Sequence, residues 1–209
     1  YAAGPRDEDT SAVLCLAEDP SSLVRRSASQ LIGLFTGGDF EGPASSAAIG
    51  LLETDDADMR REVLRGLWGA RVDRPLELRL IELARQRGAR RDAIYFALST
   101  LREKSPEVVG VLLEAVRDPV SEIRSRARFG LSRGVPPAQR RRVAASLAAS
   151  LEASVDTLHR GELVGALMQH GDERQLELLL EISTDEDAPQ FLRHRASQAV
   201  TAIERRSRD

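Results

Sequence analysis

The chain has 209 residues, of which 42% are hydrophobic and 30% charged, enough apolar surface to bury a core but too polar for a membrane protein. Its 30 basic residues against 33 acidic ones give a net charge of −3, which disfavours general nucleic-acid binding. One cysteine, Cys15, and three histidines cannot form an internal disulfide or a recognisable zinc cluster.

The same counts indicate where the protein works. Residues 1–9 carry acids where an export signal has a basic region, and a lone cysteine fits a reducing compartment. Only Lys104 among the basic residues is a lysine and asparagine is absent, a bias that a GC-rich genome produces without functional selection. We therefore expect a cytoplasmic protein of a bacterium with such a genome.

Helical stretches follow one another in pairs along the chain. Apolar residues recur with the period of a helix, and the alternation that a sheet needs is absent, so we expect no sheet. The first member of each pair is predicted over residues 11–17, 45–53, 76–86, 106–116, 140–152 and 173–182. The second member is predicted over residues 21–35, 57–70, 90–102, 120–133, 157–170 and 189–206.

An arginine in each second helix marks an internal repeat. The segments around Arg25 and Arg124 share Asp-Pro, then an aliphatic-Arg pair, then Ala three residues on, and looser copies surround four other arginines. Successive markers are 35, 31, 33, 36 and 33 residues apart. Six repeats of about 34 residues thus fill the chain, marked by Arg25, Arg60, Arg91, Arg124, Arg160 and Arg193.

Each second helix carries one apolar stripe. The stripe falls one residue before the marker and three, seven and ten residues after it, which is a single helix face. In the first repeat it comprises Val24, Ala28, Ile32 and Phe35, and in the sixth Leu192, Ala196, Val200 and Ile203. In repeats 3 and 5 the neighbouring Arg90 or His159 could serve as the marker instead.

Turn residues separate the predicted helices. Asp19 and Asp118 are expected to cap the second helices, with Pro20 and Pro119 in the first helical position, where no amide bond is lost. Left-handed glycines are expected to end helices, at Gly37, Gly38, Gly88, Gly134 and Gly171.

These motifs resemble the HEAT repeat, particularly the short bacterial form also found in phycobilin lyase subunits. The resemblance implies an all-α fold, a right-handed αα-superhelix of six helix pairs that forms one domain over residues 1–209. Its repeats would span about 9–37, 43–71, 75–104, 106–135, 137–171 and 172–206. It also implies an Asp–Arg ladder, which would involve Asp19 with Arg25, Asp118 with Arg124, and Asp187 with Arg193.

In such an array the second helices line the concave side. Side chains that contact a partner are then expected one, five and eight residues after each marker, opposite the core stripe. Several of these positions hold aromatic, Met or Arg residues, which often anchor interfaces. The candidate partner-binding residues are Arg61, Arg65, Trp68, Phe96, Phe129, Met168 and His194.

Each candidate also has a purely structural interpretation. The rings could fill the seam between adjacent repeats. The arginines Arg60, Arg61 and Arg65 could form a solvated face paired with nearby acids, which is the interpretation we favour for them. Cys15 is expected to pack as a small hydrophobe, and the histidines to be structural or exposed.

The sequence therefore predicts a non-catalytic scaffold or adaptor that presents the concave face of the array to a protein or peptide, with an acidic partner the best complement. We expect no catalytic residue, no cofactor, no metal and no membrane contact. The alternative is an enzyme or enzyme subunit on the same scaffold, of the phycobilin lyase or DNA glycosylase kind. Trp68 and Asp92 permit the comparison with the glycosylases, which combine aromatic residues with a catalytic Asp.

Overall fold

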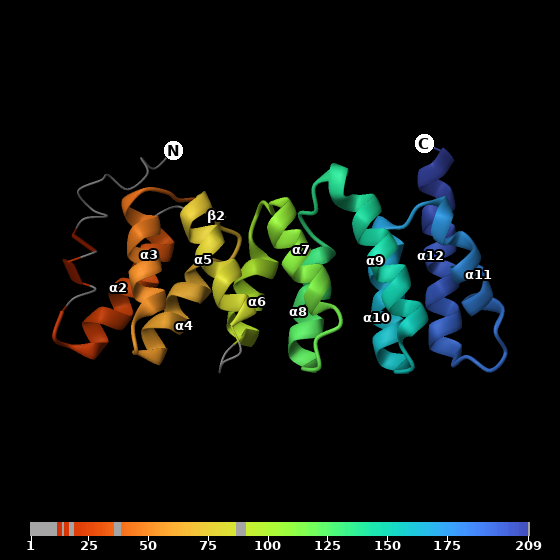
Figure 1. The fold of residues 1–209 in the computed structure, drawn as a ribbon, viewed down its shortest axis with the longest axis horizontal. Coiled ribbons are helices and arrows are strands. Elements are labelled where there is room, and N and C mark those ends of the chain that lie inside the picture. Colours follow the sequence, from red (N-terminus) through yellow and green to blue (C-terminus); the bar gives the residue numbers. More distant parts are fainter. Residues whose placement is uncertain (1–11, 14, 17–18, 36–38, 87–90, 209) are drawn as a thin grey trace. The chain divides into compact units, whose positions relative to one another are not determined.

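The computed structural model describes residues 12–13, 15–16, 19–35, 39–86 and 91–208, and within them the predicted all-α class is confirmed (Figure 1). The second helices of the repeats are α2 (Ser22–Phe35), α4 (Ala57–Gly66), α6 (Arg91–Thr100), α8 (Ser121–Leu131), α10 (Thr157–His170) and α12 (Gln190–Arg208). The first helices are α3 (Pro43–Glu53), α5 (Arg74–Arg85), α7 (Pro106–Ala115), α9 (Arg140–Ala153) and α11 (Leu176–Thr184). Short 3₁₀ turns, η1 (Pro137–Gln139) and η2 (Glu173–Gln175), precede α9 and α11.

The chain divides into two compact units, an N-terminal unit, Tyr1–Lys104, and a C-terminal unit, Ser105–Asp209. The boundary falls between the third and fourth predicted repeats. In the N-terminal unit α3 packs on α5, and α2 and α6 both pack on α4. In the C-terminal unit α7 packs on α9, and α8 and α12 both pack on α10. Each unit thus has a layer of first helices and a layer of second helices. A single right-handed domain over residues 1–209 stays a prediction.

The predicted stripe forms the contact surface of the second helices. In repeats 2 and 6 its members are buried, and in repeat 4 all but Gly134 are buried. Examples are Met59, Val63, Ile123, Leu131 and Leu192. In repeats 3 and 5 the residues three and seven after Arg91 and Arg160 are buried as well, namely Ile94, Leu98, Leu163 and Leu167. This burial supports Arg91 and Arg160 as the markers.

The marker arginines fasten the turn that precedes their helix. Arg25 Nη1 donates to the main-chain carbonyl of Asp19 at 2.8 Å, and Arg124 Nη1 donates to that of Asp118 at 2.9 Å. Arg60 makes the equivalent bond to Thr54. Arg25 also forms an ion pair across repeats, 3.7 Å from the carboxylate of Asp56. Arg25 is therefore partnered by a carbonyl of its own repeat and by an acid of the next.

The Asp-Pro dipeptides lie before the second helices rather than at their first turn. Asp19 Oδ1 accepts the Ser21 amide at 2.7 Å, and Asp118 Oδ1 accepts the Val120 amide at 3.0 Å. Each Asp therefore closes a turn over the two residues that follow it, and α2 and α8 begin later than predicted. The side-chain caps are elsewhere: Asp56, for example, accepts amides in the first turn of α4.

Contrary to expectation, two linkers pair as short parallel strands. The strand β1 (Asp39–Phe40) lies beside β2 (Arg71–Val72), in register one repeat apart. The third repeat continues the contact, because the Gly69 amide donates to Thr100 at 3.0 Å and the Arg102 amide to Ala70 at 2.9 Å. Stacked repeats bring equivalent linkers side by side in the same direction, so their main chains can hydrogen-bond.

The predicted glycine turns have two different origins. Gly134 has φ of +66°, the left-handed conformation expected after a helix. Gly171 does not, with φ of −60°; a Cβ there would lie 2.7 Å from Ile203 Cδ1. Close approach of α12, rather than backbone conformation, requires this glycine. Gly37, Gly38 and Gly88 lie outside the described residues.

The small residue three positions after the marker gives the first prediction. Ala28, Ala127 and Ala196 are all buried there. Replacing Ala127 by Leu is expected to overpack the core and lower the free energy of unfolding by about 1 to 3 kcal/mol. Ala149→Leu, at an exposed position of α9, should change it by less than about 0.5 kcal/mol. Equal losses in denaturant titrations of the two variants would contradict this register.

The carbonyl bonds of the marker arginine give the second prediction. Arg124 donates to Asp118 and to Pro119, both at 2.9 Å. Arg124→Gln is expected to lower the free energy of unfolding by about 1 kcal/mol, because these carbonyls lose a charged donor. Arg126→Gln, exposed on the same helix, removes the same charge and serves as the control. If both variants have the same denaturation midpoint, the marker does not stabilise the turn.

Candidate protein-binding surface

In the N-terminal unit the structure brings two predicted anchors together. Trp68 follows the end of α4 and Phe96 lies in α6, with ring centroids 5.0 Å apart and planes tilted by 58°. Trp68 is 62% exposed, whereas Phe96 is only partly exposed. Trp68 is therefore not a seam residue. Phe96 supports its indole ring from the neighbouring repeat and holds a large apolar surface in solvent.

The predicted arginines lie on α4, which ends just before Trp68, and they are already paired. Arg61 pairs with Asp58, and Arg65 Nη1 lies 3.2 Å from Glu62 Oε1. The solvated, acid-paired face that we favoured from the sequence is thus present. The Arg65 side chain is still 67% exposed, whereas its partner Glu62 is buried. A carboxylate of a partner can therefore approach the exposed part of the Arg65 guanidinium while the pair with Glu62 is kept.

In the C-terminal unit the candidates lie on three successive second helices. Phe129 of α8 is partly exposed, and the Arg133 guanidinium lies over its ring, 4.9 Å from the ring centre. Met168 of α10 is partly exposed, and its carbonyl accepts a bond from Arg206 at 2.7 Å. His194 of α12 is exposed and lies 3.0 Å from the side-chain amide of Gln198. All three remain reachable from solvent.

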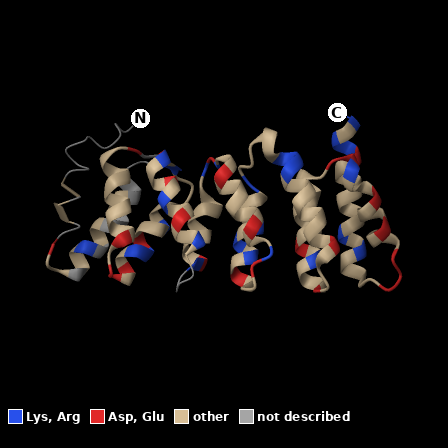
Figure 2. Ribbon diagram, viewed as in Figure 1, with Lys and Arg blue, Asp and Glu red and all other residues tan. Residues whose placement is uncertain are grey.

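The two helix layers of the C-terminal unit differ in charge (Figure 2). The second helices α8, α10 and α12 together contain nine arginines and three glutamates. The first helices α7, α9 and α11 contain three arginines and five glutamates. The overall charge of −3 therefore conceals a basic layer of second helices. Local charge of this sign attracts carboxylates.

A charged cluster joins α8 to α10. The buried guanidinium of Arg128 pairs with Glu162, and its Nη1 lies 2.8 Å from His159 Nδ1. A guanidinium can only donate, so this Nδ1 must be unprotonated. Burial, followed by the charges of Arg128 and Arg124, lowers the pKa of His159 below its ordinary 6.5. The cluster holds His159 as a neutral acceptor.

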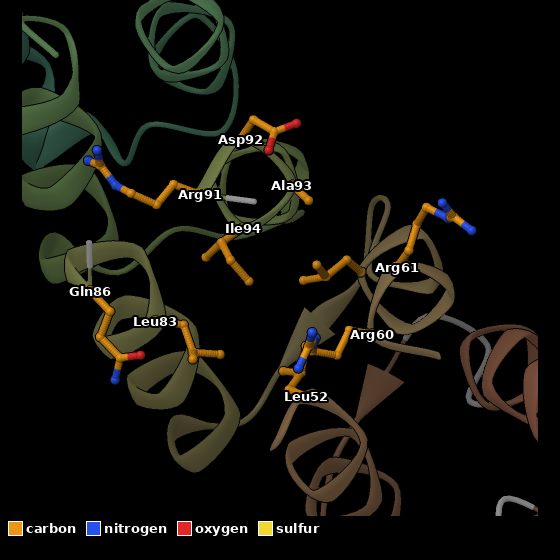
Figure 3. A pocket seen from close by; sticks show the side chains of 10 residues that line it. Leu52, Arg60, Arg61, Leu83, Gln86, Arg91, Asp92, Ala93 and Ile94 are labelled. Atoms are coloured by element: carbon orange, nitrogen blue, oxygen red, sulfur yellow. The ribbon is translucent and has the colours of Figure 1, made fainter. Parts of the chain in front are cut away.

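A cavity of about 430 Å³ opens between α3, α4, α5 and α6 of the N-terminal unit (Figure 3). Leu52, Leu83 and Ile94 point toward its centre, while Arg61 and Asp92 point away from it. Trp68 is not among the lining residues. Asp92 and Trp68 thus do not share this cavity, which a glycosylase-like pairing of the two would need.

The sequence reasoning missed a groove of about 500 Å³ between α10 and α12. Its apolar lining residues are Leu158 and Phe191, each two positions before a marker arginine. Leu23, at the same position of the first repeat, is also exposed. The sequence offered one signal for this groove: an apolar residue two positions before the marker, outside the buried stripe. Among the predicted candidates only His194 lines the groove.

His170 has a structural contact, whereas Cys15 is exposed to solvent. His170 Nε2 donates to the carbonyl of Leu131 at the end of α8, and burial lowers the pKa of its imidazole. Cys15 is exposed, so the prediction that it packs as a small hydrophobe is wrong. Val13, two residues earlier, is buried instead.

Within the described residues no three His, Cys, Asp or Glu side chains converge in a way that would hold a metal ion. No helix in the same part of the chain has the length and apolar character needed to cross a membrane.

Comparison with known proteins shows the fold alone. No family model matches the chain, and no curated protein matches it. Three engineered proteins whose crystal structures come from the Northeast Structural Genomics Consortium are similar, each 16% identical over 94% of this chain. Their TM-scores are 0.62, 0.57 and 0.58, and the match covers 97%, 99% and 58% of their respective chains.

The two partly buried imidazoles give a prediction for pH. The pKa values of His159 and His170 are lowered in the folded state, so the unfolded chain binds more protons below about pH 6.5. The free energy of unfolding should therefore fall as the pH falls from 7.5 to 5.5. His159→Gln, which keeps an acceptor for Arg128, should reduce this pH dependence. Denaturant titrations at pH 7.5 and 5.5 measure the change in the free energy of unfolding. If His159→Gln shows the same change as the wild type, His159 is not a source of the pH dependence.

Proposed function

We propose that this protein is a non-catalytic scaffold of the HEAT type, which binds an acidic segment of a protein partner along its second helices. The all-α fold with helices packed in series supports the scaffold class. The recurring marker arginine and its bond to the preceding turn support the HEAT type in particular.

The single observation that carries the proposal is the Trp68–Phe96 pair. A 62% exposed indole on an aromatic support is costly to leave in water and is the commonest kind of interface anchor. Arg65 lies one helical turn before it, where it can orient a carboxylate. The Trp68–Phe96 pair is thus a hydrophobic anchor with a cation, Arg65, beside it.

The charge of the second helices supports an acidic partner. They carry the arginine excess in the C-terminal unit, and Arg61 and Arg65 add cations in the N-terminal unit. A protein segment suits this surface better than a nucleic acid, because the same helices interleave their arginines with Asp58, Glu62 and Glu162. Fixed acids beside the cations would repel a continuous phosphate backbone.

Trp68→Ala tests the proposal. After a partner is captured from the native organism and purified, the variant is expected to raise its Kd about thirtyfold, the loss of about 2 kcal/mol typical of an anchor. Because Trp68 is mostly exposed, helicity and melting temperature should stay near wild type. Calorimetric titration measures the Kd, and circular dichroism measures helicity and melting temperature.

The controls separate the anchor from its surroundings. Leu78→Ala removes a side chain that is 47% exposed on α5, in the other helix layer of the same unit, and should leave the affinity unchanged. Arg65→Glu should weaken binding through charge. A wild-type Kd for Trp68→Ala would remove this residue from the binding surface and with it the main support for the proposal.

A further inference from the structure

A groove between α10 and α12 is separate from the Trp68–Phe96 pair. We define the α10/α12 groove by its lining residues, which come from both helices and belong to the C-terminal unit. They are Leu158, Glu162, Phe191, His194, Arg195 and Gln198. On α12 they repeat with spacings of three, four and seven residues, so they share one face of the helix. The groove lies along matching faces of two neighbouring second helices.

A glycine shapes the floor of the groove. A Cβ on Gly161 would lie 2.9 Å from Phe191 Cε2, so only a glycine lets this ring lie against α10. Arg195 Nη1 also reaches the α10 main chain and donates to the Gly161 carbonyl at 2.9 Å. One turn later Gly165 has no atom within 4 Å of the equivalent position. The main chain of α10 is therefore closely covered at Gly161 and open at Gly165.

The walls of the groove expose apolar side chains. Leu158 is 73% exposed, and Phe191 is 45% exposed despite its contact with α10. Large apolar groups that meet at a concave surface lose water favourably when a further apolar group covers them. The volume of about 500 Å³ is ample for one large side chain of a partner.

The charge of the lining determines which groups can accompany that side chain. Glu162, the one acid of the lining, is paired with the buried Arg128, so its charge is already offset. Arg195 is the one arginine of the lining. The groove thus combines apolar walls with a cation, and a partner segment needs an acid beside its apolar residue.

We propose that the α10/α12 groove binds one large apolar side chain of an acidic protein segment, with a neighbouring carboxylate on Arg195. This inference rests on the proposed scaffold function and adds a specificity to it: the segment carries a Phe or Leu among acids. It concerns different residues from the Trp68–Phe96 pair, so each can fail without the other.

Synthetic peptides test the groove without knowledge of the natural partner. The probe is a fluorescein-labelled peptide of twelve residues, Asp and Glu around one central Phe, titrated with the full chain in fluorescence anisotropy. One companion peptide has Ala in place of Phe, and another has Lys in place of the acids. Loss of the Phe side chain is expected to weaken binding about tenfold or more, and the basic peptide should not bind.

Substitutions locate the site. Leu158→Glu removes an exposed wall and adds a negative charge, so it should weaken binding of the Phe peptide at least tenfold. Leu180→Glu is the matched control, because Leu180 is 48% exposed on α11, in the other helix layer. Gln198→Glu adds a charge in the groove without loss of size and should weaken binding severalfold, whereas Gln190→Glu, outside the lining, should not. Circular dichroism checks that each variant is folded.

Several outcomes would overturn the inference. Equal affinity for the Phe and Ala peptides, or no binding of either, would show that the groove takes no apolar anchor. Equal losses from Leu158→Glu and Leu180→Glu would place the peptide elsewhere. If a twelve-nucleotide single-stranded DNA binds as tightly and with the same dependence on Leu158, the surface is a general anion site. A dimer in sedimentation that Leu158→Glu dissociates would assign the groove to a second copy of the chain.

Discussion

A helix pair of about 34 residues cannot bury the apolar stripe of its own second helix, and the rest of the structure depends on this constraint. Within each unit the stripes of neighbouring repeats cover one another, as Val63 in α4 and Leu163 and Leu167 in α10 illustrate. Small residues such as Ala127 keep the helices close. Because the stripe is buried against neighbouring repeats, the side chains opposite it are left on the outer surface of each unit.

Polar contacts hold the ends of the stacked helices. Three marker arginines, Arg25, Arg60 and Arg124, bind carbonyls of the turn before their own helix. At the other end a later repeat binds the last carbonyls of the helix before it: His170 reaches Leu131, and Arg206 reaches Met168 and Gly171. Cations at the carboxyl ends of helices also offset the helix dipole. Much of the arginine content is thus structural, which leaves a smaller set for recognition.

The same layer of second helices differs between the two units. In the N-terminal unit an aromatic pair, Trp68 and Phe96, projects one large side chain into solvent. In the C-terminal unit Leu158 and Phe191 line a recess instead. A projecting anchor inserts into a partner, whereas a recess receives one. Two such features on one chain suit a scaffold that recognises more than one element of its target, which would raise specificity without a large continuous interface.

The sequence by itself determined the helices, their pairing and the face that each second helix buries, because 3.6-residue periodicity and the marker spacing repeat six times. It also indicated Trp68, Arg61 and Arg65 as members of one face. Only the tertiary structure decided that Trp68 is exposed and Phe96 supports it, that Cys15 is exposed, that linkers pair, and that Phe191 lies over Gly161. Periodicity determines which side chains share a face. How far a neighbouring helix covers that face depends on the shift and tilt between repeats, which no spacing within one helix encodes.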